Sequence, residues 1–306
     1  MKHFARFLMA GAAALGLAAA PTAVAAQLKV VTSTTDLYDI ARAVGGSRIR
    51  ATHIAEGYQD PHYVEAKPSY VLQLRDADVF AFVGLDLEVG WMSLLLEGAR
   101  NSRITAGGSG HLDVSRAIPV LDVVTGRVDR SQGDVHPMGN PHYWLDVHNG
   151  LRIARLFERT FASLDPAGAP AYERNRAAFE QRVNAATAEW APLLAQLEGK
   201  QVVAWHTSWR YFAAYTGMNI VGFVEPKPGV PPSAQHLAGL IQTIRRTGVK
   251  VIIMEPFYDR KVADRIASLS GAKVLVLPPS VGGIRGVDSY IEMMRYNIRQ
   301  LVSALS

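Results

Sequence analysis

Short runs of apolar, β-branched residues alternate along the chain with segments of helical periodicity. The run LKVVTST (28–34) predicts a buried strand, and DLYDIARAVGG (36–46) predicts a helix that ends at glycine. Strands and helices in this order are typical of βαβ units, which place parallel strands in one sheet. The elements expected in this half are strands over 28–34, 49–54 and 78–84 and helices over 36–46 and 68–77.

The same alternation restarts after Gly199, whereas the segment 106–140 is rich in glycine and turns and predicts no regular element. The second half therefore repeats the α/β pattern of the first. Its expected strands are 201–206, 219–224, 249–255 and 272–277, and its expected helices end near 215, cover 233–246 and 259–270, and begin near 287.

Two helical patterns, 149–164 and 170–197, lie between the halves. The second pattern has one apolar face, and Pro192 predicts a kink near its end. At 1.5 Å per residue this helix would be about 40 Å long, enough to cross from one domain to another. The alternative is two shorter helices inside one domain. The apolar face consists of Tyr172, Phe179, Val183, Ala186, Trp190, Leu193 and Leu197.

These patterns predict an α/β protein of two lobes, each with a mainly parallel sheet and flanking helices, joined by one long rigid helix. The chain has 306 residues, which exceeds one typical domain. The expected division is a signal peptide over 1–26, an N-terminal α/β lobe over 27–165, the linking helix within 166–199 and a C-terminal α/β lobe over 200–306.

The N-terminal segment has the three parts of a secretory signal. Lys2 and Arg6 form the positive end, residues 7–20 are apolar, and Ala23 and Ala25 suit a cleavage site. We expect cleavage near residue 25 or 26 and export to the periplasm. An uncleaved membrane anchor is the alternative, but the apolar run falls short of the ~20 residues that span a bilayer.

Composition narrows the possible chemistry. The formal net charge is +5, two of the basic residues lie in the signal segment, and basic and acidic residues are interspersed, so the charge is no argument for a nucleic-acid partner. The chain has no cysteine. Disulfides, thiolate metal sites and a cysteine nucleophile are therefore excluded, and any metal must bind to His, Asp or Glu.

Three histidines occupy comparable places in the two halves. His62 follows the second expected strand, His142 precedes the helix pair, and His206 ends the first expected strand of the second half. Ligands of open α/β sheets bind outside the carboxyl ends of the strands. Pro61 and Pro141 precede two of these histidines and stiffen the turns that present them. Buried core histidines are the alternative interpretation.

Three motifs around these histidines carry a resemblance to a known family. DPHYVEAKPS (60–69), NPHYWLD (140–146) and WHTSWRYFAAYTG (205–217) resemble the cluster of metal-specific periplasmic solute-binding proteins that serve zinc and manganese ABC importers. The resemblance runs across nearly the whole mature chain. It implies two α/β lobes, a rigid linking helix and one metal ion in the cleft between the lobes. It also implies a membrane permease and an ATPase as partners, and we expect a monomer.

Carried over residue by residue, the resemblance implies His62, His142 and His206 as ligands. A histidine at the third place is typical of zinc-type members, and three neutral imidazoles suit Zn²⁺ better than Mn²⁺. Many members also have an aspartate just after the last strand, where this chain has Pro278 and Pro279. Because proline cannot coordinate, we expect Glu255 as the fourth ligand.

Other candidates for the fourth position are Asp60, Glu65, Asp259 and a water molecule. Glu255 could instead form a hydrogen bond with a ligand histidine without contacting the metal itself. Five other histidines are assigned by context. His136 could capture metal transiently, and His3 leaves with the signal. The assignments left are solvent exposure, packing or turns for His53, His111 and His236.

The sequence thus predicts a non-enzymatic zinc-binding protein, with Zn²⁺ bound as the transported ligand. A manganese-specific protein of the same fold is one alternative. A secreted zinc hydrolase with Glu255 as base is another, although no HExxH motif is present. A protein for organic or anionic solutes would show converging Arg or backbone donors instead. Because bound histidines must be neutral, capture should weaken as the pH falls through about 6.

Overall fold

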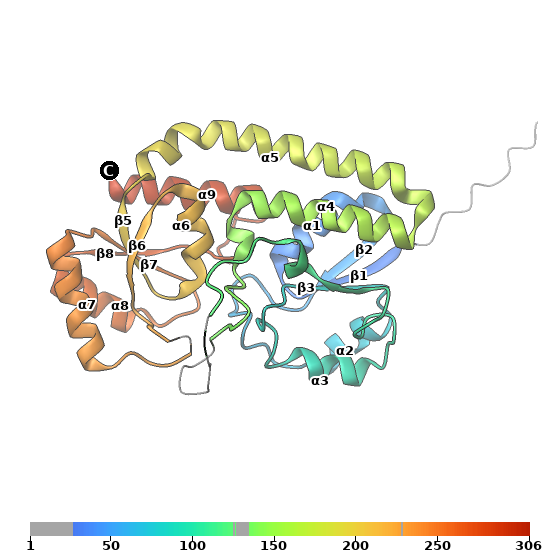
Figure 1. The fold of residues 1–306 in the computed structure, drawn as a ribbon, viewed down its shortest axis with the longest axis horizontal. Helices are drawn as coiled ribbons and strands as arrows, with labels where there is room; N and C mark the ends of the chain where they lie inside the picture. Colours follow the sequence, from blue (N-terminus) through green and yellow to red (C-terminus); the bar gives the residue numbers. More distant parts are fainter. Residues whose placement is uncertain (1–26, 125, 127–134, 228) are drawn as a thin grey trace, which may run out of the picture.

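Two parallel four-stranded sheets form the two halves of the molecule (Figure 1). The computed structural model describes residues 27–124, 126, 135–227 and 229–306, so the expected signal peptide lies outside the described residues. The strand order is β2-β1-β3-β4 in the first sheet and β6-β5-β7-β8 in the second. The strands are β1 (Leu28–Thr32), β2 (Ile49–His53), β3 (Val79–Phe82), β4 (His111–Asp113), β5 (Gln201–Ala204), β6 (Asn219–Phe223), β7 (Val251–Met254) and β8 (Lys273–Val276).

The two sheets have the same topology, because the first strand of each lies between the second and third. All the pairs are parallel. The carboxyl ends of the strands in each sheet therefore lie at one edge. The expectation of two mainly parallel α/β lobes is confirmed.

Helices flank both sheets, and their ends agree with local sequence signals. Thr34 caps α1 by accepting a hydrogen bond from the Leu37 backbone, and Ser233 caps α7 in the same way. The helices are α1 (Thr35–Gly45), α2 (Pro68–Arg75), α3 (Met92–Ala99), α4 (Val147–Leu164), α5 (Ala169–Leu197), α6 (Arg210–Thr216), α7 (Ala234–Thr247), α8 (Arg260–Ser270) and α9 (Tyr290–Leu305).

Two elements were not predicted. The strand β4 has three residues, all only partly buried, so it lacks an apolar run. The helix α3 begins at Met92, its N-cap residue Trp91 makes no side-chain capping hydrogen bond, and few of its positions are buried. Neither element carries the periodicity or the boundary residues on which sequence-based assignment depends.

A single helix, α5, extends along one side of both lobes (Figure 1). It runs for 29 residues and includes Pro192, so the alternative of two shorter helices is wrong. Its predicted apolar face is buried except at Leu193, which is partly exposed. The C-terminal helix α9 lies beside α5 and reaches α1 in the first lobe.

The two lobes share one hydrophobic core beneath α5. A continuous cluster of buried side chains includes Ile40 of α1, Phe157 of α4, Trp190 of α5 and Ile253 of the second sheet. Two smaller clusters cover the far faces of the sheets. Because the shared cluster continues through both lobes, their relative orientation is fixed by packing as well as by the linking helix.

Hydrogen bonds also join the two lobes close to the strand ends. Trp144 donates from its indole to the Pro279 carbonyl at 2.7 Å, and Tyr290 donates to the Trp144 carbonyl at 2.6 Å. Thr35 donates to the carbonyl of Val281 at 2.7 Å. These contacts hold the loop after β8 against the first lobe. Among the described residues, no helix combines the length and the apolarity that a membrane span requires.

Candidate metal centre

Three imidazoles from three separate loops meet between the lobes. His62 lies between β2 and α2, His142 lies just before α4, and His206 follows β5. One ring nitrogen of each lies within 4.8 Å of the others, and the ring centroids are 5.3 to 5.5 Å apart. His142 and His206 are buried, and the side chain of His62 is only 9% exposed. The structure therefore brings together the three histidines that the motifs singled out.

His62 and His142 are held by the same local hydrogen bonds. The side-chain oxygen Oδ1 of Asp60 accepts from the His62 backbone N–H at 3.0 Å and lies 2.6 Å from its Nδ1. Asn140 Oδ1 accepts from the His142 backbone N–H and lies 3.0 Å from its Nδ1. In each turn the residue two positions before the histidine fixes both its backbone and its ring.

His206 is positioned by a carboxylate that is distant in sequence. Its Nδ1 lies 3.3 Å from Oε1 of Glu225, which also accepts from the Gly229 backbone N–H at 2.6 Å. Each of the three rings thus has an oxygen beside Nδ1. This arrangement favours the tautomer with hydrogen on Nδ1 and leaves the Nε2 lone pair for a ligand.

The histidines line a cavity that has room for little more than one ion. Its volume is about 10 Å³, close to the smallest space that holds a water molecule. Pockets for organic ligands are typically about 300 to 1,000 Å³. Pro279 and Ser280 form part of the wall. The other lining residues are Asp60, Pro61, Trp144, Ser208, Phe257 and Tyr258.

Burial favours the uncharged form of His142 and His206. It lowers the pKa of His142 well below its usual value, and the neighbouring His206 and His62 lower it further. Burial also lowers the pKa of His206, although Glu225 partly opposes this effect. The pKa of Asp60 would rise through burial, but hydrogen bonds from His62 outweigh this and lower it. Neutral imidazoles beside an ionised carboxylate suit a cation.

Glu255 follows the strand that neighbours β5 and lies outside the close group of ligand atoms. The register pairs Ala204 of β5 with Ile253 of β7, so His206 and Glu255 follow neighbouring strand ends. Glu255 is fully buried, and neither carboxylate oxygen has a hydrogen-bond partner among the described residues. Burial raises its pKa to about 8, against a smaller opposing effect of Ser208 nearby. Its role as a ligand stays a prediction.

The other carboxylates considered for the fourth position either have other contacts or are exposed. Asp60 is engaged with His62, Glu65 is exposed, and Asp259 caps α8 by accepting from the Lys261 backbone. The histidines assigned to packing and turns have such contacts. His53 packs edge-on against the ring of Tyr38, His111 bonds the Ile104 carbonyl and His236 bonds the Phe223 carbonyl.

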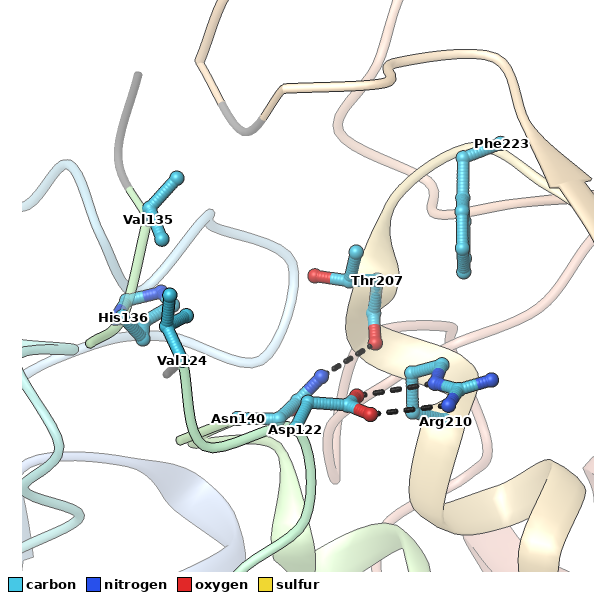
Figure 2. A pocket seen from close by; sticks show the side chains of 8 residues that line it. All are labelled: Asp122, Val124, Val135, His136, Asn140, Thr207, Arg210 and Phe223. Atoms are coloured by element: carbon cyan, nitrogen blue, oxygen red, sulfur yellow. Dashed lines mark hydrogen bonds and ion pairs between the residues drawn. The ribbon is translucent and has the colours of Figure 1, made fainter. Parts of the chain in front are cut away.

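A hollow of about 450 Å³ opens between the lobes beside the metal centre (Figure 2). The Asp122 carboxylate accepts two hydrogen bonds from Arg210 across it, at 2.9 and 3.0 Å. His136 lies on the side formed by the first lobe. This histidine is buried, and its Nε2 is 3.2 Å from Nε2 of His62. Burial, with a smaller effect of His62, lowers the pKa of His136 to about 3.

Sequence analysis missed the residues that orient the rings. The signal for Asn140 was present, because the spacing Asx-Pro-His occurs twice. It was interpreted only as a stiff turn. Glu225 carries no local signal, since it is 19 residues from His206 and approaches it only through the pairing of β5 with β6.

Two parallel α/β lobes, one linking helix and three inward-facing imidazoles define a two-lobed metal-binding protein of the substrate-binding class. Comparison with known proteins then gives the family. The family model described as zinc-uptake complex component A, periplasmic (ZnuA), matches residues 30–304. The chain therefore belongs to this family, whose members are metal-binding substrate-binding proteins of ABC importers.

Relatives in the family differ in the metal for which they are named. The chain is 27% identical to the manganese-binding lipoprotein MntA of Halalkalibacterium halodurans over 285 residues, covering 91% of this chain and 89% of the relative. It is 24% identical to the zinc-binding lipoprotein AdcA of Streptococcus pneumoniae serotype 4 over 280 residues, covering 90% of this chain and 55% of that longer protein.

Solved structures share the fold. A zinc-bound deletion mutant of ZnuA has a TM-score of 0.75 at 24% identity, covering 92% of this chain and 98% of the other. A cadmium-bound periplasmic metal-binding protein from Candidatus Liberibacter asiaticus has a TM-score of 0.74 at 20% identity, covering 92% and 100%. At these identities the likeness concerns the fold alone.

Proposed function

We propose that this protein captures Zn²⁺ between its lobes in the periplasm and delivers it to the permease of an ABC importer, which works with a partner ATPase. The observation that carries the proposal is the group of three imidazoles, two buried and one largely buried, with their Nδ1 atoms beside oxygens. Neutral imidazole nitrogens are preferred ligands of Zn²⁺, whereas Mn²⁺ prefers more oxygen.

Zinc is chosen over manganese on the chemistry of the donors. Manganese-named relatives make Mn²⁺ the alternative cargo. The cavity favours an ion over an organic solute, because about 10 Å³ cannot hold a larger molecule. The protein is proposed to act as a monomer, exported after cleavage near residue 25 or 26.

A metal titration tests the proposal. Purified protein is titrated with Zn²⁺ and with Mn²⁺ against a competing chelator, beside His142→Ala and the control His148→Ala. His148 has the same ring contact to an acidic residue two positions earlier, Asp146, but its side chain is 65% exposed and outside the cluster.

We expect one Zn²⁺ per chain, weaker binding of Mn²⁺ and no change in His148→Ala. His142→Ala should lose affinity by at least about tenfold, which corresponds to about 1.4 kcal/mol. Binding of neither metal by the unsubstituted protein would refute the function. Tighter binding of Mn²⁺ than of Zn²⁺ would refute zinc as the transported ion. Undiminished zinc binding by His142→Ala would show that His142 is not a ligand.

A further inference from the structure

His136 is the fourth imidazole at the metal centre. It belongs to the short segment that leads to the turn of Asn140, and the Gly139 backbone donates to its carbonyl at 3.0 Å. Its ring centroid lies 5.2 Å from that of His62 and 6.3 Å from that of His142. No hydrogen-bond partner for its Nδ1 is found among the described residues, although the side chain is buried.

The distance between the Nε2 atoms of His136 and His62 matches the spacing of two nitrogen ligands on one metal ion. With Zn–N bonds of about 2.0 to 2.1 Å, two nitrogens at corners of a tetrahedron are about 3.3 to 3.4 Å apart. The two Nε2 atoms are 3.2 Å apart. Asp60 lies beside Nδ1 of His62, so the lone pair on His62 Nε2 faces His136. Both rings can thus direct a nitrogen to one ion.

Among the described residues, the wall of the cavity near Pro279 presents neither an imidazole nor a carboxylate. Pro279 and Ser280 form the wall where a carboxylate was expected, and the Pro279 carbonyl is already bonded to Trp144. Glu255 is outside the group of mutually close ligand atoms. The nearest additional ring nitrogen is therefore on the side of the first lobe, at His136.

His136 also lies where an ion would enter. It lines the hollow of Figure 2, and it lines a second hollow of about 350 Å³ beside His62 and Tyr63. The other three histidines are held by oxygens at Nδ1, but His136 is not. The ring nitrogens of His136 also lie outside the group in which the ligand nitrogens of His62, His142 and His206 are all within 4.8 Å of one another. A small inward rotation of this ring is needed to complete a tetrahedron.

We propose that His136 is the fourth ligand of the transported ion and replaces the carboxylate that is missing at Pro278. The inference rests on the proposed function. It makes the donor set four nitrogens, three from the first lobe and one from the second. Such a set favours Zn²⁺ over Mn²⁺ more strongly than three nitrogens and a carboxylate would.

The test compares His136→Ala, His136→Gln and Glu255→Gln with the unsubstituted protein. Zinc affinity is measured by chelator competition, and the visible absorption of the Co²⁺ complex reports the number and type of donors. Circular dichroism establishes that each variant is folded. We expect both His136 variants to lose zinc affinity by about tenfold or more and to shift the Co²⁺ bands, because water or an amide oxygen replaces nitrogen.

Glu255→Gln should leave the Co²⁺ bands unchanged. Unchanged affinity and bands in both His136 variants would overturn the assignment of His136 while leaving the proposed function intact. A shift in Glu255→Gln alone would assign the fourth position to Glu255 instead. Absence of zinc and cobalt binding in the unsubstituted protein would refute the proposed function itself, so the two failures are distinguishable.

Discussion

Asn140 links a ring of the metal centre in one lobe to the backbone of the other lobe. Its Nδ2 donates a hydrogen bond to the Thr207 carbonyl at 2.9 Å (Figure 2), while its Oδ1 lies beside Nδ1 of His142. Thr207 directly follows His206. One amide side chain therefore couples the position of His142 to the segment that carries His206.

Substitutions at Asn140 should separate these two roles. Asn140→Ala removes the acceptor for His142 and the donor to Thr207, and we expect zinc affinity to fall about 10- to 100-fold, the usual effect of losing a residue that orients a ligand. Asn140→Asp keeps an acceptor for His142 but places an oxygen against the Thr207 carbonyl. We expect it to bind zinc more tightly than Asn140→Ala and to unfold at a lower temperature than the unsubstituted protein.

The measurements are chelator competition and thermal unfolding without metal. His148→Ala provides the control, because it removes an equivalent ring contact on the surface. Equal zinc affinity in Asn140→Ala and the unsubstituted protein would contradict a positioning role. Equal melting temperatures for Asn140→Asp and the unsubstituted protein would contradict the coupling between lobes.

The sequence predicted the general position of the site because strand ends are recognisable. Apolar runs located the ends of β2 and β5 to within two residues, and parallel strands place their carboxyl ends at one edge. His62 and His206 follow such ends, and the Asx-Pro-His spacing placed His142 in a turn of the same kind as His62. The apolar face of α5 likewise predicted one long linking helix.

Contacts made through the tertiary structure could not be predicted. Glu225 reaches His206 only because β6 pairs with β5, and His136 reaches His62 across 74 residues of chain. Glu255 was predicted as a ligand from its strand end alone. Strand register places Glu255 and His206 just after neighbouring strand ends, but a sequence pattern does not fix the direction of a side chain to within the distance that coordination requires.

Zinc binding should resist acid better than ordinary histidines would allow. Three imidazoles with pKa values near 6.5 would lower zinc affinity several hundredfold between about pH 7 and 5.5. Burial lowers the pKa of His142 well below its usual value and lowers that of His206 in the same direction, so fewer protons compete with the metal in this range. We therefore expect a fall in zinc affinity clearly smaller than several hundredfold, measured by competition at both pH values. A loss of several hundredfold would show that these rings titrate normally.

Glu255→Gln should change how stability depends on pH in the metal-free protein. In the folded protein the Glu255 carboxyl group keeps its proton up to about pH 8, whereas in the unfolded chain it releases the proton near pH 4.5. Between these two pH values the folded state binds more protons than the unfolded state. The free energy of unfolding of the unsubstituted protein therefore falls as the pH rises. Glutamine does not ionise. The free energy of unfolding of Glu255→Gln should therefore rise relative to the unsubstituted protein from pH 5 to pH 8.

Urea unfolding with a chelator present, at pH 5 and pH 8, measures this difference. Glu173→Gln is the matched control, because Glu173 is exposed on α5. The control should show a difference from the unsubstituted protein that is the same at both pH values. A pH-independent difference for Glu255→Gln would show that its carboxyl group is not buried in its protonated form.

The close approach of α4 to Tyr290, the first residue of α9, depends on the absence of a side chain at Gly150. A Cβ atom there would lie 2.6 Å from the ring and hydroxyl of Tyr290, which is fully buried and donates to the Trp144 carbonyl. Alanine in a helix interior gains about 0.5 to 1 kcal/mol over glycine. Overpacking of a buried site costs about 1 to 3 kcal/mol, so the steric effect dominates. We expect Gly150→Ala to be destabilising by about 1 to 2 kcal/mol.

Gly239→Ala separates the steric cost from the helix preference. Gly239 lies inside α7, and a Cβ atom there would meet nothing within 4 Å. This variant should be more stable than the unsubstituted protein by about 0.5 to 1 kcal/mol in urea unfolding. A lower free energy of unfolding in Gly150→Ala and a higher one in Gly239→Ala would attribute the difference to the contact with Tyr290. Because Tyr290 anchors the backbone two residues after His142, Gly150→Ala should also weaken zinc binding, and Gly239→Ala should not.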